Sequence, residues 1–174
     1  MKRLLNFWLA TAYFLFMSTG SYAHQTANPV SLDQTIGTIN TPKAIVDLMK
    51  KKFTFVEDDK LFGRTDYWQS PEELWSRKAS DCEDYALFAQ SILRKNGIEA
   101  EVLSIYGTEG YAHTIVIFKE DGLFRILNQA KLERFRAKSI HEAIEKLNPE
   151  WTWAAIAEEH NHRGKSIKTI LRLR

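Results

Sequence analysis

The sequence predicts a single α+β domain in which a buried helix packs against an antiparallel β-sheet. The chain has 174 residues, of which 44% are hydrophobic, and this is enough to bury one core. Hydrophobic residues recur at helical spacing over residues 82–96, and strand-like segments rich in apolar and β-branched residues follow at 100–106, 112–119 and 123–128. Because the helix precedes strands joined by short turns, a helix on an antiparallel meander is the expected arrangement.

The composition excludes several classes of protein. Charged residues make up 26% of the chain, which is ordinary for a globular protein and excludes a disordered one. The single cysteine excludes an internal disulfide and a cysteine-rich zinc site. The formal net charge of +2 gives no electrostatic reason to expect nucleic acid as a partner.

Residues 1–23 have the features of an export signal. A basic start precedes a mostly apolar stretch over residues 4–17, and the small residues Ser21 and Ala23 stand where a signal peptidase reads. The alternative is a retained membrane anchor, but a span needs roughly 20 apolar residues and this stretch is shorter. We therefore expect a signal peptide and a periplasmic or secreted protein. Without its two basic residues the mature chain has 22 basic and 22 acidic residues and is formally neutral.

The first half of the remaining chain is expected to hold an arm and two helices. Residues 24–40 are polar and lack helical periodicity, so we interpret them as an N-terminal arm, and residues 41–174 as the folded domain. Thr41 is a predicted N-cap before Pro42 at the first helical position, and this helix is expected to end near Lys52. A short helix follows at "PEELWS", where a capping-box pattern begins it.

The central helix is the clearest element of the sequence. Ala86, Ala89 and Leu93 follow one helical face, and the bulky residues between them predict burial on much of the helix surface. Asp81 or Ser80 is a natural N-cap, and Gly97 stands just past the other end as a C-cap.

The second half is expected to be a hairpin followed by further helix. Asp121 and Gly122 form a two-residue hairpin turn between the second and third strands. Residues 139–148 predict an amphipathic helix, and residues 151–160 a further short helix. The basic tail after residue 162 is open to two interpretations, an edge strand or a loose C-terminus.

The lone cysteine, Cys82, falls in the first turn of the buried helix. The free amides and the dipole at this position favour an anion and predict a lowered thiol pKa. A thiolate nucleophile also needs a base and a group that orients the base. A hairpin centred on the Asp121-Gly122 turn brings the strand ends at His113 and Asn128 side by side, and packing of the helix on the sheet would bring Cys82 to His113. The alternative is a buried structural cysteine with an unrelated histidine.

Several motifs together resemble one protein family. The run "DYW-x-x-P-E-E-L", the motif "DCEDYA" at 81–86, "AH" at 112–113 and "ILN" at 126–128 look like the bacterial transglutaminase-like cysteine proteinases. The resemblance covers roughly residues 66–132. It implies a papain-like or transglutaminase-like core.

The resemblance also implies roles for the residues that match its motifs. Cys82 would be the nucleophile and His113 the general base, while Asn128 stands where the family usually has an aspartate. An asparagine can still accept a hydrogen bond from the imidazole through its carbonyl oxygen. It cannot supply a negative charge, so a non-catalytic binding or regulatory module is the alternative.

Acidic residues around the nucleophile suggest calcium through the same resemblance. Family members that cleave surface adhesins bind calcium through the acidic residues of this motif, which here are Asp81, Glu83 and Asp84. Carboxylate oxygens suit that hard cation. The alternative is that these residues only cap the helix and favour its N-terminal dipole.

Oxyanion stabilisation is expected from the backbone amide of Cys82 and one further donor. Trp68 and Gln69 in the upstream motif are the candidates, with aromatic packing and an exposed turn as their alternative roles.

The predicted function is that of an exported cysteine peptidase that forms a thioester intermediate. The chemistry requires no cofactor, although the resemblance suggests Ca²⁺. The expected substrate is a protein or peptide. The resemblance implies that it is a surface adhesin, and that an inner-membrane protein is a regulatory partner. A transglutaminase, in which an amine in place of water releases the acyl group, or an amidase is the other open interpretation. The "HNH" run at 160–162 is too short to indicate a metal or nuclease site.

Overall fold

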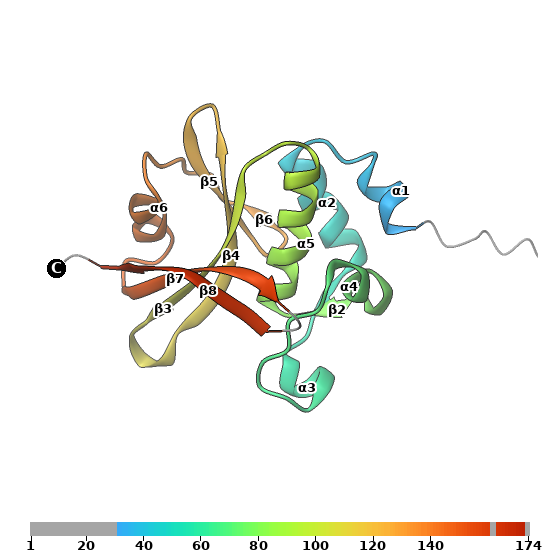
Figure 1. Cartoon of the computed structure of the whole chain (residues 1–174), viewed down its shortest axis with the longest axis horizontal. Helices are drawn as coiled ribbons and strands as arrows, with labels where there is room; N and C mark the ends of the chain where they lie inside the picture. The colour runs from blue at the N-terminus through green and yellow to red at the C-terminus, as the bar shows by residue number, and fades with distance from the viewer. Residues whose placement is uncertain (1–30, 161–162, 173–174) are drawn as a thin grey trace, which may run out of the picture.

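The computed structural model describes residues 31–160 and 163–172, and it confirms the predicted α+β fold. Six strands form one antiparallel sheet in the order β6-β5-β4-β3-β7-β8. Figure 1 shows helices α1, α2, α4 and α5 on one side of this sheet and α6 on the other. The predicted signal peptide lies outside the described residues.

The segments before the central helix are short. They are α1 (Leu32–Ile36), α2 (Pro42–Lys52), β1 (Thr54–Phe55), α3 (Asp58–Phe62), α4 (Pro71–Arg77) and β2 (Ala79–Ser80). Thr41 caps α2 as predicted, with Pro42 at its start. Ser70 and Glu73 form the predicted capping box of α4.

The prediction of a polar arm over residues 24–40 is wrong for its second half. Ser31 opens α1 with a capping box, and Ile36 and Ile39 are buried in the core. Five residues are too few to display a helical repeat, which is why periodicity did not reveal this helix.

The central helix α5 runs from Cys82 to Lys95 and packs on β3 and β4. Phe88, Ile92 and Leu93 have no exposed surface, as the apolar pattern predicts. Gly97 follows the helix at φ +75°, a left-handed conformation that favours glycine. At the other end Asp81 occupies the N-cap position, but its side chain makes no capping hydrogen bond.

The sheet contains the predicted meander and three strands beyond it. Its strands are β3 (Ala100–Gly107), β4 (Ala112–Glu120), β5 (Leu123–Asn128), β6 (Lys131–Leu132), β7 (Trp151–His160) and β8 (Arg163–Leu171). Asp121 and Gly122 join β4 to β5 at φ +53° and +76°, the left-handed pair that a type I′ hairpin turn requires. The tail is the edge strand β8, one of its two predicted forms.

The predicted helix over 151–160 is wrong, because this segment is strand β7 beside β3. Trp151, Ala154 and Ile156 belong to the core on the α6 side, whereas Ala157 belongs to the core on the α5 side. A strand that is buried on both faces loses the alternation by which strands are recognised, and a short apolar run then resembles a helix.

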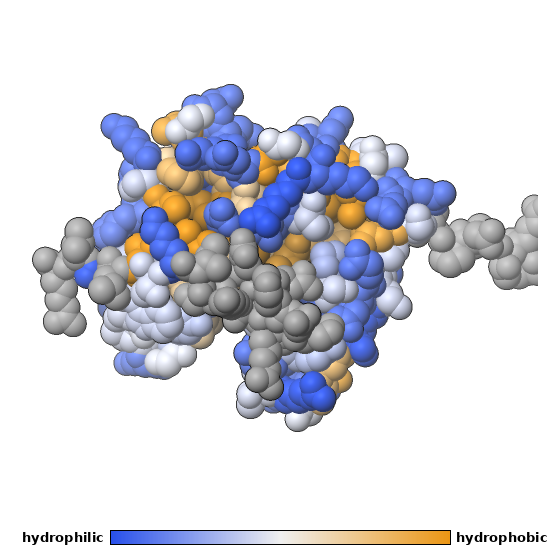
Figure 2. Space-filling model, viewed as in Figure 1, coloured by the Kyte–Doolittle hydropathy of each residue, from blue (hydrophilic) through white to orange (hydrophobic). Residues whose placement is uncertain are grey.

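Helix α6 (Ile140–Leu147) closes the second face of the sheet, and Ser139 caps it. The sheet therefore separates two hydrophobic clusters, one under α5 and one under α6. Figure 2 shows hydrophobic side chains gathered in the middle of one face of the molecule, with hydrophilic side chains around them. Within the described ranges, no helix combines the length and the apolar character needed to cross a bilayer.

Candidate active site

A cavity of about 450 Å³ opens where the start of α5 meets strands β3 and β4. Cys82 and His113 both line it, from two elements that are far apart in the sequence. Trp68 lines it from the loop before α4, and Tyr106 from β3. The structure thus brings the two residues with the predicted nucleophile and base roles to one cavity.

Cys82 is half-buried at the first position of α5. The backbone amide of Thr114, the residue after His113, lies where it donates a hydrogen bond to the thiol. The thiol itself contacts the Glu83 carboxylate, with 3.3 Å between Sγ and Oε2. The packing of α5 on β4 therefore fixes the sulfur beside the strand that carries the histidine.

The pKa of the thiol differs from the expectation. Burial, followed by the negative charge of Glu83, raises the pKa of Cys82 above its usual range. The amide of Thr114 acts in the opposite direction but does not outweigh these two causes. The helix dipole favours the thiolate, but burial and the adjacent carboxylates outweigh it, so the prediction of a lowered pKa is wrong for this structure.

The β4–β5 hairpin joins His113 to Asn128, as its turn predicts. Ile117 lies opposite Ile126 in this register, and the side chains at the strand ends meet with 2.7 Å between His113 Nε2 and Asn128 Oδ1. Because a carbonyl oxygen only accepts hydrogen bonds, this contact assigns the ring proton to Nε2. The neutral imidazole is then left with Nδ1 as its proton acceptor.

Sequence reasoning missed Glu133, which completes this chain of contacts. Its Oε1 accepts a hydrogen bond from Asn128 Nδ2 at 3.1 Å, and Glu133 is only 7% exposed. Lys131 pairs with its other oxygen at 2.8 Å. The turn between β5 and β6 brings Glu133 back beside Asn128, and no spacing motif marks that turn in the sequence.

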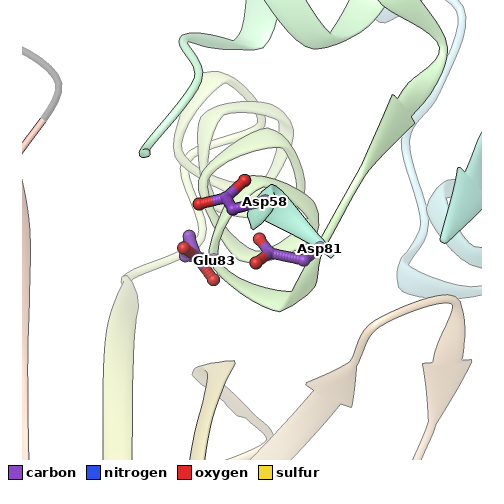
Figure 3. Close-up of side chains that lie close together, drawn as sticks. All are labelled: Asp58, Asp81 and Glu83. Atoms are coloured by element: carbon purple, nitrogen blue, oxygen red, sulfur yellow. The ribbon is translucent and has the colours of Figure 1, made fainter. Parts of the chain in front are cut away.

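Three carboxylates gather beside Cys82: Asp58, Asp81 and Glu83 (Figure 3). One oxygen of each lies within 4.8 Å of the others. Burial raises the pKa of all three, and the Asp81 and Glu83 carboxyls share a hydrogen bond. Oδ1 of Asp58 and Oδ1 of Asp81 are buried and have no hydrogen-bond partner within the described structure. Sequence reasoning missed Asp58, which reaches the cluster from α3.

Asp84, the third predicted calcium ligand, lies outside this cluster. Its Oδ1 accepts from the backbone amide of Gln69 at 2.6 Å and its Oδ2 from the Gln69 side chain at 2.5 Å. Burial raises the pKa of Asp84 to about 8. This residue ties α5 to the loop before α4, and the third carboxylate of the cluster is Asp58.

The same contacts contradict the predicted oxyanion role of Gln69. Its side-chain amide donates to Asp84 and to the Ala79 carbonyl, its carbonyl accepts from Arg77, and the residue has no exposed surface. Trp68 does line the cavity, but its indole N–H donates to Asp66 at 2.9 Å. The side-chain donors of both candidates are therefore already engaged.

Another histidine, His141, belongs to helix α6 on the other face of the sheet (Figure 1). His141 is half-buried against Trp151, with 5.1 Å between the ring centroids. In the run at 160–162, the side chains lie outside those that the structure describes.

Residues 11–159 match the model of a family described as bacterial transglutaminase-like cysteine proteinase. No curated protein matches the chain. Among solved structures, the chain is similar to LapG from Legionella pneumophila at 19% identity, covering 66% of this chain and 64% of that one with a TM-score of 0.47. A calcium-bound form of the same protein matches at 20% identity, with 72% and 71% of the two chains covered and a TM-score of 0.48. The chain thus spans 64% of the first of these proteins, less than two thirds of its length.

Proposed function

Since the chain belongs to the family of bacterial transglutaminase-like cysteine proteinases, we propose that it hydrolyses peptide bonds through Cys82. The observation that carries this proposal is the arrangement of three side chains. Cys82 and His113 line one cavity, and Asn128 holds the imidazole through Nε2. A nucleophile, a base and a group that orients the base are what covalent catalysis by a thiol needs.

The reaction begins with transfer of the thiol proton from Cys82 to Nδ1 of His113. The thiolate then attacks the carbonyl carbon of the peptide bond, and a tetrahedral intermediate forms whose oxyanion lies near the amide groups at the start of α5. As the C–N bond breaks, the imidazolium returns the proton to the leaving amine, and the acyl group stays on sulfur as a thioester. Water, deprotonated by His113, releases the acid and restores the thiol.

The substrate and its location belong to this proposal as well. We infer an exported enzyme from the basic and apolar pattern of residues 1–23. A protein exposed outside the cytoplasm, such as a surface adhesin, is then the substrate within reach, and an inner-membrane protein the regulatory partner. The engaged His113–Asn128 pair favours an active enzyme over a binding module that merely retains the fold.

The proposal is tested with purified protein and the exported surface proteins of the source cells. We expect the wild type to generate new fragments, which mass spectrometry identifies by their new termini. The control is the same preparation alkylated with iodoacetamide until mass spectrometry shows complete modification of Cys82, the one cysteine of the chain. Identical fragments from active, alkylated and buffer-treated samples would contradict the proposal.

Calcium fits the residues beside the nucleophile. The Asp58, Asp81 and Glu83 carboxylates offer hard oxygen ligands, and two of their buried oxygens have no hydrogen-bond partner among the described residues. When bound there, the ion would neutralise these carboxylates and fix the start of α5. We propose that these three residues hold it, while Asp84 supports the fold.

Calcium should therefore stabilise the protein. At a concentration 100-fold above its dissociation constant, the ion is expected to add about 2.7 kcal/mol to the free energy of unfolding, a rise in melting temperature of roughly 5–10 °C. Differential scanning fluorimetry with and without EGTA measures this shift. Asp58→Asn should abolish the shift, whereas Asp47→Asn, at an exposed surface ion pair, should preserve it. An equal shift in both variants would exclude the proposed ligands.

A further inference from the structure

The side-chain amide of Asn128 is engaged at both ends. Its carbonyl oxygen meets His113 Nε2 at 2.7 Å, and its NH₂ group donates to Glu133 Oε1 at 3.1 Å. Resting on the proposed protease function, we propose that Glu133 is a positioning residue that fixes the orientation of Asn128 and, through it, the tautomer of His113.

The hydrogen-bonding capacity of the neighbouring groups allows one orientation of the Asn128 amide. A carboxylate paired with a lysine accepts hydrogen bonds and does not donate them, so Glu133 can face only the NH₂ end of the amide. Rotating Asn128 by half a turn would set its oxygen against the Glu133 oxygen and its NH₂ against the Nε2–H of His113. Both contacts would be repulsive, so only the observed orientation is stable.

Glu133 is itself held firmly enough to do this. Its side chain is 10% exposed, and Lys131 Nζ lies 2.8 Å from its Oε2. Its backbone amide donates to the Ile126 carbonyl at 2.9 Å, which anchors the residue to strand β5. An acceptor fixed by both backbone and ion pair keeps its geometry better than an exposed side chain would.

The consequence for His113 is the position of its proton. With the oxygen of Asn128 toward the ring, Nε2 carries the proton and Nδ1 is the base. If Asn128 turned over, its NH₂ would favour an unprotonated Nε2 and place the proton on Nδ1, which removes the base. Glu133 thus performs a task that a family aspartate at position 128 would perform alone, since a carboxylate has two equivalent acceptor ends and needs no orienting partner.

This predicts an exchange of roles between positions 128 and 133. Glu133→Ala should lower kcat by about 10- to 100-fold with KM within about twofold, because it affects the base and not substrate contacts. Asn128→Asp alone should be impaired, since two carboxylates would face each other. Asn128→Asp combined with Glu133→Gln should recover activity, because glutamine can donate to the new aspartate. Glu101→Ala, which removes a carboxylate from an exposed ion pair with Arg94, is the matched control and should stay within about threefold.

The test reads the tautomer directly in protein labelled with ¹⁵N-histidine, using His113→Gln to assign the signal. We expect a protonated Nε2 in wild type and a mixture of tautomers in Glu133→Ala, while melting temperatures show that each variant is folded. An unchanged tautomer with unchanged kcat in folded Glu133→Ala, or a double variant no better than Asn128→Asp, would overturn the positioning role. The NMR measurement needs no substrate, so it separates the two proposals. If the wild type cleaves nothing but Glu133→Ala still changes the tautomer of His113, the protease function is refuted and the positioning role of Glu133 stands.

Discussion

Cys82→Ala is expected to lower kcat for substrate cleavage by about 10⁵- to 10⁶-fold, the loss seen when a covalent nucleophile is removed. Alanine keeps the Cβ at the first position of α5 but leaves no atom to attack the carbonyl carbon. His113 and Asn128 remain paired, but the base can then activate only a water molecule. The site positions a sulfur atom and not this water, so the residual rate is low. Initial rates of fragment formation, measured by quantitative mass spectrometry, give the ratio.

The fold should survive this substitution. Cys82 is half-buried, and alanine removes a single sulfur atom and its contact with the Glu83 carboxylate. The melting temperature should therefore stay close to that of wild type. Ser91→Ala, which changes a half-buried residue on the same helix away from the cavity, is the matched control and should keep full activity. Cleavage by Cys82→Ala at more than a thousandth of the wild-type rate would contradict Cys82 as the nucleophile.

Phe88→Ala is expected to cause the largest loss of stability, about 3–5 kcal/mol in the free energy of unfolding. Phe88 has no exposed surface and packs within an aromatic group. Its ring centroid is 4.8 Å from that of Phe53 in an edge-on contact and 6.3 Å from that of Trp75 in a stacked one. Truncation would leave a cavity where α5 meets α2 and α4, because these helices cannot all collapse toward it.

Urea unfolding followed by tryptophan fluorescence measures this effect, and the melting temperature should fall by roughly 10–20 °C. Phe55→Ala is the control, since Phe55 is 45% exposed and its loss should change stability by about 0.5 kcal/mol or less. Equal losses of unfolding free energy in Phe88→Ala and Phe55→Ala would show that the burial of Phe88 does not hold α5 in place.

Local patterns were sufficient to predict the central helix and the hairpin. The apolar face of α5 and the Asp121-Gly122 turn set where Cys82, His113 and Asn128 lie, and the 2.7 Å contact across the hairpin agrees with them. These features depend on residues that are close in sequence, so periodicity and turn chemistry are enough to reveal them.

The features that escaped prediction depend on contacts between distant segments. Asp58 joins Asp81 and Glu83 only because the β1–β2 pairing and α3 bring residues 54–62 back beside the start of α5. Glu133 meets Asn128 only after the chain reverses between β5 and β6. No spacing rule expresses either reversal, and neither residue stands within a recognisable motif.

Tertiary packing also gives some residues a role that differs from the one predicted from the sequence. Asp84 and Gln69 were expected at the reaction site, but their side chains satisfy one another in the interior. The motif "DCEDYA" therefore serves two purposes. Asp81 and Glu83 face the carboxylate cluster, whereas Asp84 fastens the helix to the loop that carries Trp68.

The central claim is that Cys82 forms a thioester with the substrate, and capture of this intermediate by an added amine tests it most directly. The wild type is incubated with its substrate and increasing hydroxylamine, and mass spectrometry determines the new C-terminus of the fragment that carried the acyl group. A thioester partitions between water and hydroxylamine, so the account predicts a hydroxamate whose share rises with hydroxylamine concentration. A new C-terminus that is always a free carboxylate, at every hydroxylamine concentration, would contradict it.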